Sequence, residues 1–296
     1  MAKRFLSIGE CMVEFAQTGA GAYHQGFAGD TFNTAWHVRR DLGPGWRVGY
    51  FTALGTDIWS DRLLAFMAAE GIETDHIVRL PGRAPGIYVI DHLDGERRVS
   101  YWRETSAARA LADDPEALEA AIGSANALFF SGITLAILAP DARGQLLSAL
   151  DRAKARGATV AFDSKLRPGL WPDRGTLRAA IRSAARVSTI ALPTLPSEAE
   201  LFGEKGAEAV AERYQQDGCP EVVVRNGSEP ALVVWKGGRA RVAPERRPRP
   251  LDSTGAGDSF NGAYLAARVM GVKPEEAAHR AHDAAADTDQ AHGALA

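Results

Sequence analysis

The chain has 296 residues, of which 46% are apolar and 24% charged, with a formal net charge of −3 and a pI near 6.2. This composition is ordinary for a soluble globular protein with a core of its own, and it lacks the basic footprint of a nucleic-acid-binding protein. No apolar run is long enough to span a membrane, and the first one ends at Glu10, which indicates a strand rather than a signal peptide. With only Cys11 and Cys219, a disulfide framework is not expected, so we expect a cytoplasmic protein without a membrane partner.

Strand and helix patterns alternate along the chain. Strand patterns lie at residues 5–8, 48–54, 127–130, 159–162, 189–192, 221–224 and 232–235, and helical patterns begin near residues 31, 58, 141, 174, 197, 256 and 274. Asp30 and Asp57 can cap the first two helices. This alternation predicts one α/β domain over residues 1–296, a doubly wound, mostly parallel sheet flanked by helices. The active site of such a sheet lies at the carboxyl ends of its strands.

The segment 252–260, Asp-Ser-Thr-Gly-Ala-Gly-Asp-Ser-Phe, opens a long helical pattern. Gly255, Ala256 and Gly257 allow a sharp turn that exposes backbone N–H groups, and the helix N-terminus adds further donors and a positive dipole end. This combination predicts an anion hole suited to phosphate. A carboxylate at a phosphate site needs a function, and we predict that Asp258 is the base that deprotonates an incoming hydroxyl. The alternative is an ordinary helix start in which Asp258 is a first-turn acid.

Residues 87–102 predict a β-hairpin that interrupts the α/β alternation. Asp94-Gly95 is the preferred dipeptide of a type I′ turn, and counting back from it places Tyr88 opposite Tyr101. The side chains that share one face are then Gly86, Tyr88, Tyr101 and Arg103. We interpret this hairpin, together with residues 14–29, as a small β-strand lid whose phenols and guanidinium face a ligand. The alternative is an amphipathic edge hairpin with solvated arginines.

Other chemical positions follow strands or begin helices. Lys165 and Arg167 come directly after the strand pattern 159–162, and Arg167 can pair bidentately with a carboxylate. Glu198 begins a helix and can hold the water shell of a metal ion, although a first-turn glutamate usually interacts with the helix dipole. His282 lies in the last helical pattern, where a surface histidine is the plainer interpretation. No histidine or cysteine cluster has transition-metal spacing.

The segment 252–260 resembles the C-terminal motif of the ribokinase-like (PfkB) sugar kinases, and most of the chain resembles their 2-keto-3-deoxygluconate kinase branch. The matching segments are residues 8–12, 29–33, 53–57, 101–103, 131–133, 163–171 and 252–262. Within them, the Tyr-x-Arg and Arg-Pro pieces point to an acidic keto-sugar. The chain departs from the pattern at Lys165, where the family often has Asn, and in 195–198, where only Glu198 of the Asn-x-x-Glu metal motif survives.

The resemblance implies a role for each matching position. The implied sugar-binding residues are Gly29, Asn33, Tyr88, Tyr101, Arg103, Arg167 and Asp258. The implied nucleotide-binding residues are Arg225, Asn226, Gly227, Ser228, Gly255 and Gly257. We also expect Lys165 and His282 on the nucleotide side: the Lys165 ammonium can offset charge on the transferring phosphoryl group, and the alternative is a Lys165 side chain turned to solvent. Asp258 would be the base, Gly255, Ala256 and Gly257 the anion hole, and Glu198 a water-mediated magnesium ligand. The implied cofactors are ATP and Mg²⁺, with a monovalent cation near Asp252, and we expect a homo-oligomer.

These features predict ATP-dependent phosphorylation of 2-keto-3-deoxygluconate at its primary C6 hydroxyl. A kinase for neutral sugars, such as a fructokinase or ribokinase, would leave Arg103 and Arg167 without a carboxylate partner, which is costly for desolvated charges. A galactonate-derived substrate stays open. A sensor that binds sugar or nucleotide without catalysis is the alternative outside the kinases, and an acid beside phosphate argues against it.

Overall fold

The computed structural model describes residues 2–93, 96–246, 251–290 and 293–295. Its main sheet has eight strands in the order β14-β13-β12-β11-β10-β9-β1-β4. Their bounds are β1 Lys3–Ile8, β4 Trp46–Phe51, β9 Ala127–Ser131, β10 Thr159–Asp163, β11 Ile190–Ala191, β12 Glu221–Asn226, β13 Glu229–Trp235 and β14 Gly238–Val242. The strands from β4 to β12 run parallel, and β13 and β14 are antiparallel. The predicted doubly wound, mostly parallel sheet is confirmed.

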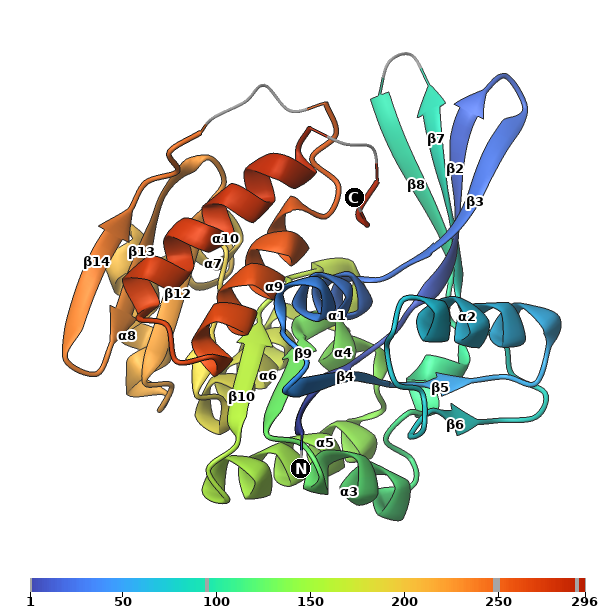
Figure 1. Cartoon of the computed structure of the whole chain (residues 1–296), viewed down its shortest axis with the longest axis horizontal. Helices are drawn as coiled ribbons and strands as arrows, with labels where there is room; N and C mark the ends of the chain where they lie inside the picture. Colours follow the sequence, from blue (N-terminus) through green and yellow to red (C-terminus); the bar gives the residue numbers. More distant parts are fainter. Residues whose placement is uncertain (1, 94–95, 247–250, 291–292, 296) are drawn as a thin grey trace.

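Helices cover both faces of the main sheet (Figure 1). One face carries α1 Asp30–Asp41, α2 Ile58–Ala69, α9 Ala256–Val269 and α10 Pro274–Thr288. The other carries α3 Pro115–Gly123, α4 Gly132–Ile137, α5 Pro140–Ala155, α6 Arg174–Val187, α7 Leu195–Phe202 and α8 Ala207–Gln216. In β1, Leu6 and Ile8 point to the second face and Phe5 to the first, because successive strand residues alternate. The sheet therefore separates two apolar cores, which fix the strand ends that carry the site.

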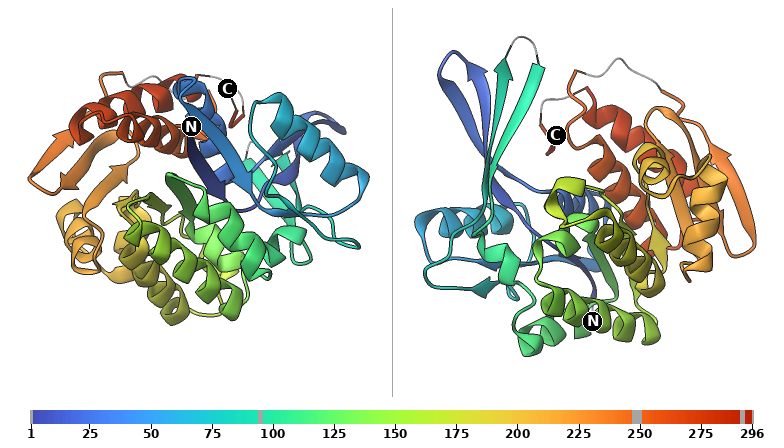
Figure 2. Two further views of the ribbon diagram at one scale, coloured as in Figure 1. Left: turned by 60° about the horizontal axis from the view of Figure 1, so that its bottom comes forward. Right: turned by 180° about the vertical axis from the view of Figure 1, so that it is seen from behind.

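A second sheet of four strands forms the small β sheet, called here the lid (Figures 1 and 2). Its order is β3-β2-β7-β8, with β2 Met12–Gly19, β3 Ala22–Ala28, β7 Ile87–Leu93 and β8 Glu96–Trp102. It rises from one rim of the main body as two hairpins (Figure 2). The Asp94-Gly95 turn lies outside the described residues. Two short strands, β5 Ala53–Leu54 and β6 Val78–Arg79, and the 3-10 turns Ala107–Ala110 and Pro168–Leu170 complete the elements.

Two local predictions need correction. Asp57 caps α2 through bonds from the Trp59 and Ser60 amides, as predicted, but the N-cap of α1 is Gly29, and Asp30 is already in the helix. The single strand expected over 48–54 is two strands, because the chain leaves the main sheet after Phe51 and pairs β5 with β6. Residues 14–28 of the segment 14–29, which was interpreted as part of the lid, lie in β2, β3 and the turn between them.

Candidate active site

Two cavities meet at the N-terminus of α9. The larger, of about 620 Å³, lies between the lid and the main body and is called here the sugar cavity. The smaller, of about 470 Å³, lies beside α10 and the end of β12 and is called the nucleotide cavity. Ser253 and Gly257 line both. The two cavities therefore adjoin at Ser253 and Gly257, next to Asp258 in the wall of the sugar cavity.

The start of α9 has the geometry of an anion hole. Gly255 has a φ of +86°, and the Asp258 and Ser259 amides donate to its carbonyl oxygen at 2.8 Å. A Cβ at this position would lie 2.6 Å from Cα of Ala294, so only glycine fits. The Ala256 amide donates to the Ser253 carbonyl oxygen at 3.4 Å, and Gly257, in the first turn of the 14-residue helix, lines both cavities, so the positive end of the helix dipole lies at their junction. Negative charge is stabilised at such a position.

Asp258 lies at this junction and is buried, with a side chain 6% exposed. Its Oδ2 accepts a hydrogen bond from Nδ2 of Asn33 at 2.9 Å, and its Oδ1 accepts one from Nζ of Lys165. Asn33 is held in turn, because its Oδ1 accepts from the Gly29 amide at 3.2 Å. At Gly29 a Cβ would lie 2.1 Å from the Glu10 carbonyl oxygen, which explains the glycine. Gly29, Asn33 and Asp258 thus form one bonded unit at the wall of the sugar cavity.

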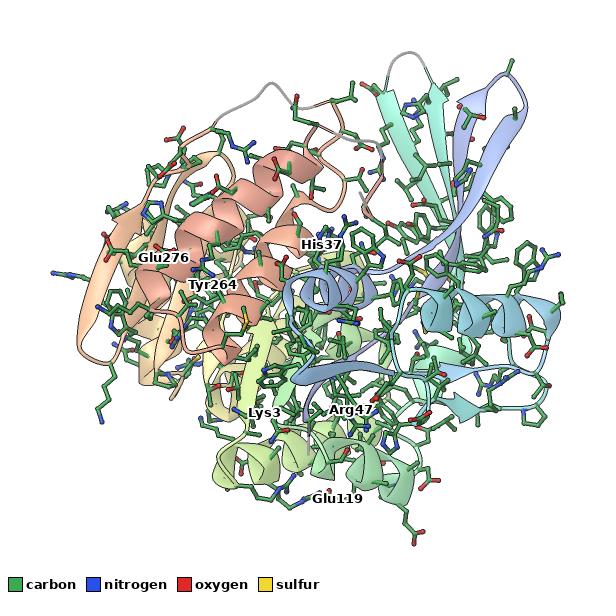
Figure 3. The ribbon with its side chains drawn as sticks, in the orientation of Figure 1. Lys3, His37, Arg47, Glu119, Tyr264 and Glu276 are labelled. Carbon is green, nitrogen blue, oxygen red and sulfur yellow. The ribbon has the colours of Figure 1, made fainter. Side chains whose placement is uncertain are left out.

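His37 lies one turn after Asn33 on α1 and is labelled in Figure 3; it packs between α1 and α9 next to this unit. Its Cβ would lie 2.4 Å from a Cβ at Gly262 of α9, and its Nε2 is 3.2 Å from the Ala294 carbonyl oxygen. Burial lowers the pKa of His37, so the ring is neutral near pH 7. The close approach of α1 and α9 at this point fixes the distance between Asn33 and Asp258.

Asp163, at the end of β10, anchors a second network below the base. It accepts hydrogen bonds from Arg225 at 2.7 Å and from Asn261 at 2.8 Å. Burial alone would raise its pKa, but Arg225 and Lys165 outweigh that effect and lower it, so Asp163 is ionised. Arg225 also donates to the Gly257 and Leu192 carbonyl oxygens, at 2.9 and 2.7 Å. This network ties the ends of β10, β11 and β12 to the anion hole.

The lid register is the one counted from the sequence. Tyr88 pairs with Tyr101 across β7 and β8, and the two rings stack with centroids 5.8 Å apart. Both rings line the sugar cavity. The Tyr88 hydroxyl donates to Glu14, and its pKa is raised by burial and by that carboxylate, so Tyr88 offers a ligand its ring more than its hydroxyl. A Cβ at Gly86 would lie 3.2 Å from Cβ of Arg103, so the glycine leaves space for the Arg103 side chain on the facing strand.

Arg103 differs from the expectation. Its guanidinium was predicted to pair with the carboxylate of a ligand. In the structure, Nη2 of Arg103 is already paired with Glu10 in a buried ion pair. Ser106 also donates to that glutamate. Within the described part of the chain, Nε of Arg103 has no hydrogen-bond partner, but this atom is buried and is not open to a ligand in this conformation. The sequence reasoning missed Glu10, whose signal was its position directly after the first strand.

Two further arginines line the sugar cavity and are exposed. Arg167 was predicted; its Nη1 donates only to the Leu166 carbonyl oxygen, at 3.0 Å. Arg97 on β8 was missed, although its spacing from Tyr101 places it on the same strand face. It lies near Asp252, whose pKa it helps to lower together with hydrogen bonds that outweigh burial. Neither arginine has an ion-pair partner within 4 Å among the described residues.

The nucleotide cavity contains most of the residues assigned to it. Arg225, Gly227, Ser228, Gly257 and His282 line it, whereas Asn226 does not. The Arg225 guanidinium is paired with Asp163, so Arg225 forms part of the cavity wall and is not a free phosphate-binding group. His282 is buried, with Nε2 3.0 Å from the Val242 carbonyl oxygen and its ring edge on Phe260, which corrects the surface interpretation. Lys165 and Gly255 line the sugar cavity instead.

Glu198 lies away from both cavities. Its carboxylate is buried and accepts from Arg213 at 2.6 Å and from the Tyr214 hydroxyl at 3.0 Å. Burial raises its pKa despite Arg213. Both oxygens are thus engaged inside the core, and the geometry does not favour a metal role. Among the described residues, no group of three or more His, Cys, Asp or Glu side chains is arranged to hold a metal ion.

Comparisons with known proteins agree with the site. The model of the pfkB family carbohydrate kinases matches residues 2–296. The 2-dehydro-3-deoxygluconokinases of Dickeya dadantii and Escherichia coli K12 are each 37% identical, over 99% and 100% of this chain and 96% and 97% of theirs. A PfkB protein from Polaromonas sp. JS666 has a TM-score of 0.87 at 31% identity, over 100% of this chain and 98% of its own. The chain belongs to the PfkB carbohydrate kinases and is a sugar kinase.

In the described ranges, no helix is long and apolar enough to cross a membrane. Both cysteines are free and buried.

Proposed function

We propose that this kinase transfers the γ-phosphoryl group of ATP to the C6 hydroxyl of 2-keto-3-deoxygluconate, also called 2-dehydro-3-deoxygluconate. The observation that carries the proposal is the position of Asp258, a buried carboxylate that lines the sugar cavity and follows Gly257, which lines both cavities. The names of the two relatives that are 37% identical point to the same sugar. A base between an acceptor cavity and a donor cavity is the arrangement that phosphoryl transfer requires.

The reaction follows from this arrangement. The C6 hydroxyl hydrogen-bonds to Asp258, which takes the proton as the hydroxyl oxygen attacks the γ-phosphorus. The bond from that phosphorus to the β–γ bridging oxygen breaks, and ADP leaves with the electron pair. The amides at the start of α9 stabilise charge on the transferred group. Asp258 then releases its proton to solvent, and the products are ADP and the sugar 6-phosphate.

The carboxylate of the sugar has three guanidinium groups within the sugar cavity. Arg167 and Arg97 are exposed and without a carboxylate partner among the described residues, so they are the principal candidates. Arg103 also lines the cavity, but Glu10 already balances its charge. A guanidinium recognises a carboxylate better than an ammonium does, because its planar fork can donate two parallel hydrogen bonds.

The lid supplies the rest of the acceptor cavity. Tyr88 and Tyr101 present a stacked pair of rings to the sugar, and polar groups line the opposite wall. Closure of β7 and β8 over a bound sugar would keep water from the γ-phosphoryl group, as substrate-induced closure does in other transferases.

Mg²⁺ is part of the proposal, since it neutralises phosphate charge in phosphoryl transfer. The described residues do not fit a preformed magnesium site, so the ion would be held mainly by the nucleotide phosphates. Asp252 fits a monovalent-cation role only in part, because its oxygens accept from the Thr254 and Gly293 amides at 2.9 and 3.0 Å. The cytoplasmic location, which rests on two free buried thiols, and the homo-oligomer stay predictions.

A fructokinase is the second candidate, because the Glu10–Arg103 pair removes the cost of leaving Arg103 without a ligand carboxylate. The test is the ratio of kcat/KM for four acceptors with ATP: 2-keto-3-deoxygluconate, its galactonate-derived epimer, fructose and ribose. The proposal predicts the highest value for one of the two acidic sugars, and for the gluconate form in particular. A higher value for fructose would replace it, and no turnover with any acceptor would favour a sensor.

A further inference from the structure

Lys165 is the feature that the proposed function does not explain. The residue lies directly after β10, and its ammonium is bonded to the base Asp258 instead of reaching into the nucleotide cavity. Its side chain is 20% exposed, whereas that of Asp258 is 6% exposed. Both side chains line the sugar cavity, but the Lys165 side chain is more open to it than that of Asp258 and has more room to move.

The backbone at Lys165 is unusual. Its φ is +33°, which makes it the only residue other than glycine with positive φ in the described part of the chain. The segment is packed tightly, since a Cβ at Gly132 would lie 1.9 Å from the Ser164 carbonyl oxygen. Positive φ is unfavourable for a residue with a Cβ and is accepted more readily by Asn than by Lys. If the turn were the sole requirement, Asn would fit better, so the lysine side chain has a role that offsets the backbone cost.

The charges around Lys165 keep it protonated. Burial disfavours the ammonium, but the carboxylates of Asp258, Asp163 and Asp30 outweigh burial and raise the pKa of Lys165. Of these carboxylates, Asp163 is paired with Arg225, and Oδ2 of Asp30 has no partner among the described residues. The ammonium is thus a permanent positive charge beside the base, at the junction where the phosphoryl group must cross.

The bond to Lys165 also occupies the base. Both oxygens of Asp258 already accept a hydrogen bond, and because this carboxylate is buried, a sugar hydroxyl must share an oxygen with one of these donors or replace it. Asn33 is fixed, because its amide group is bonded at one end to Asp258 and at the other to the Gly29 amide. Lys165 is the partner that can give way, since its side chain is long, flexible and partly exposed.

We propose that Lys165 is a catalytic residue of this kinase, whose ammonium rests on Asp258 and passes to the transferring phosphoryl group when the sugar hydroxyl takes its place on that carboxylate. The inference rests on the proposed phosphoryl transfer but not on the identity of the sugar. Two groups that hydrogen-bond one carboxylate oxygen lie about 4–5 Å apart, so the displaced ammonium is already within reach of the phosphoryl oxygens. When no sugar is bound, the Lys165 ammonium occupies Asp258. When sugar is bound, the same ammonium places a positive charge beside the transferring phosphoryl group in the transition state.

The test is Lys165→Met, assayed with whichever acceptor the parent enzyme phosphorylates. The proposal predicts that kcat for transfer falls by roughly 10²–10³-fold, as for loss of one transition-state donor, with little change in the KM for sugar. ATP hydrolysis without sugar should fall much less, because Lys165 is then bound to Asp258. Lys236→Met is the matched control, an exposed lysine outside both cavities, and it should behave like the parent.

Restoring the charge separates a catalytic role from a structural one. Lys165→Cys can be aminoethylated to a lysine analogue, and the native thiols of Cys11 and Cys219 are buried and protected. The proposal predicts recovery of most of the lost kcat after modification. If Lys165→Met fails to fold, Lys165→Gly replaces it, because glycine accepts the positive φ and has no side chain that could donate to phosphate. Near-parent kcat in the folded variant, or no recovery in the aminoethylated protein, would overturn the proposal.

The Lys165 variants can be measured with any acceptor that the parent phosphorylates, so the proposed role of Lys165 and the proposed substrate are tested separately. If the parent phosphorylates fructose but not 2-keto-3-deoxygluconate, the proposed substrate is wrong, and the Lys165 series with fructose still decides the role of the ammonium. If the parent phosphorylates 2-keto-3-deoxygluconate and Lys165→Met does so at a near-parent rate, only the role of Lys165 is wrong.

Discussion

The two cavities that meet at α9 are built in different ways. The sugar cavity is lined by five acidic and four basic side chains, several of them in ion pairs, such as Arg103 with Glu10 and Lys165 with Asp258. The nucleotide cavity has few charges, and its walls come mainly from small and apolar residues with His282 and Phe260. The acceptor side can therefore select its ligand by charge, whereas the donor side can select by shape. Substitutions should separate these two kinds of selection.

The base gives the largest expected effect. Asp258→Asn keeps the hydrogen-bonding shape of the side chain but removes the proton acceptor, so kcat should fall by roughly 10²–10⁴-fold. Binding of sugar and of ATP, measured separately by calorimetry, should change little. A variant with near-normal kcat would show that Asp258 is not the base.

Arg103→Ala should affect stability as well as binding. It leaves the buried Glu10 carboxylate without its partner, and breaking a buried pair in this way costs about 3–5 kcal/mol of unfolding free energy. Chemical denaturation of Arg103→Ala, Glu10→Gln and the double variant measures the coupling. We expect the double variant to be more stable than Arg103→Ala alone. Additive effects of the two changes would mean that the pair is not formed.

Arg167→Ala should weaken sugar binding without loss of stability, because Arg167 is exposed and has no ion-pair partner among the described residues. A charge-assisted contact contributes about 1.5–3 kcal/mol, so KM for an acidic keto-sugar should rise roughly 10- to 100-fold. Residual use of fructose should be little affected. Equal losses with both sugars would show that Arg167 does not bind the carboxylate, and Arg97→Ala would be the next variant to measure.

His282→Ala should have the smallest effect and act on the donor side alone. An aromatic contact contributes about 0.5–1.5 kcal/mol, so KM for ATP should rise roughly 2- to 10-fold with no change in KM for sugar. His279→Ala is the control, on the same helix but outside both cavities. A larger effect on sugar than on ATP would contradict the assignment of the two cavities.

Local patterns predicted the parts of the site that depend on local sequence. The Gly255–Asp258 turn, the Asp57 cap and the Tyr88–Tyr101 register follow from residue types at fixed spacing. The pairs formed between distant segments did not follow, because spacing says nothing of which side chains meet across a fold. Lys165 and Asp258 are 93 residues apart, as are Glu10 and Arg103.

The contacts of single charged residues could not be predicted for the same reason. Glu198 was read as a helix-start glutamate with a metal role, but its partners Arg213 and Tyr214 come from the next helix. Lys165 was expected near the nucleotide because it follows a strand end, and the contact of its ammonium with Asp258 could not be seen in the sequence. Arg97 was overlooked, although strand alternation alone places it with Tyr101.

The central claim is that phosphate is transferred to C6 of an acidic keto-sugar. The most direct measurement is the product formed from ATP and 2-keto-3-deoxygluconate labelled with ¹³C at C6, observed by phosphorus–carbon coupling in NMR. The account predicts one ADP per sugar phosphate, with the phosphorus coupled to C6. Release of ADP without a labelled phosphate ester, or coupling to another carbon, would contradict it.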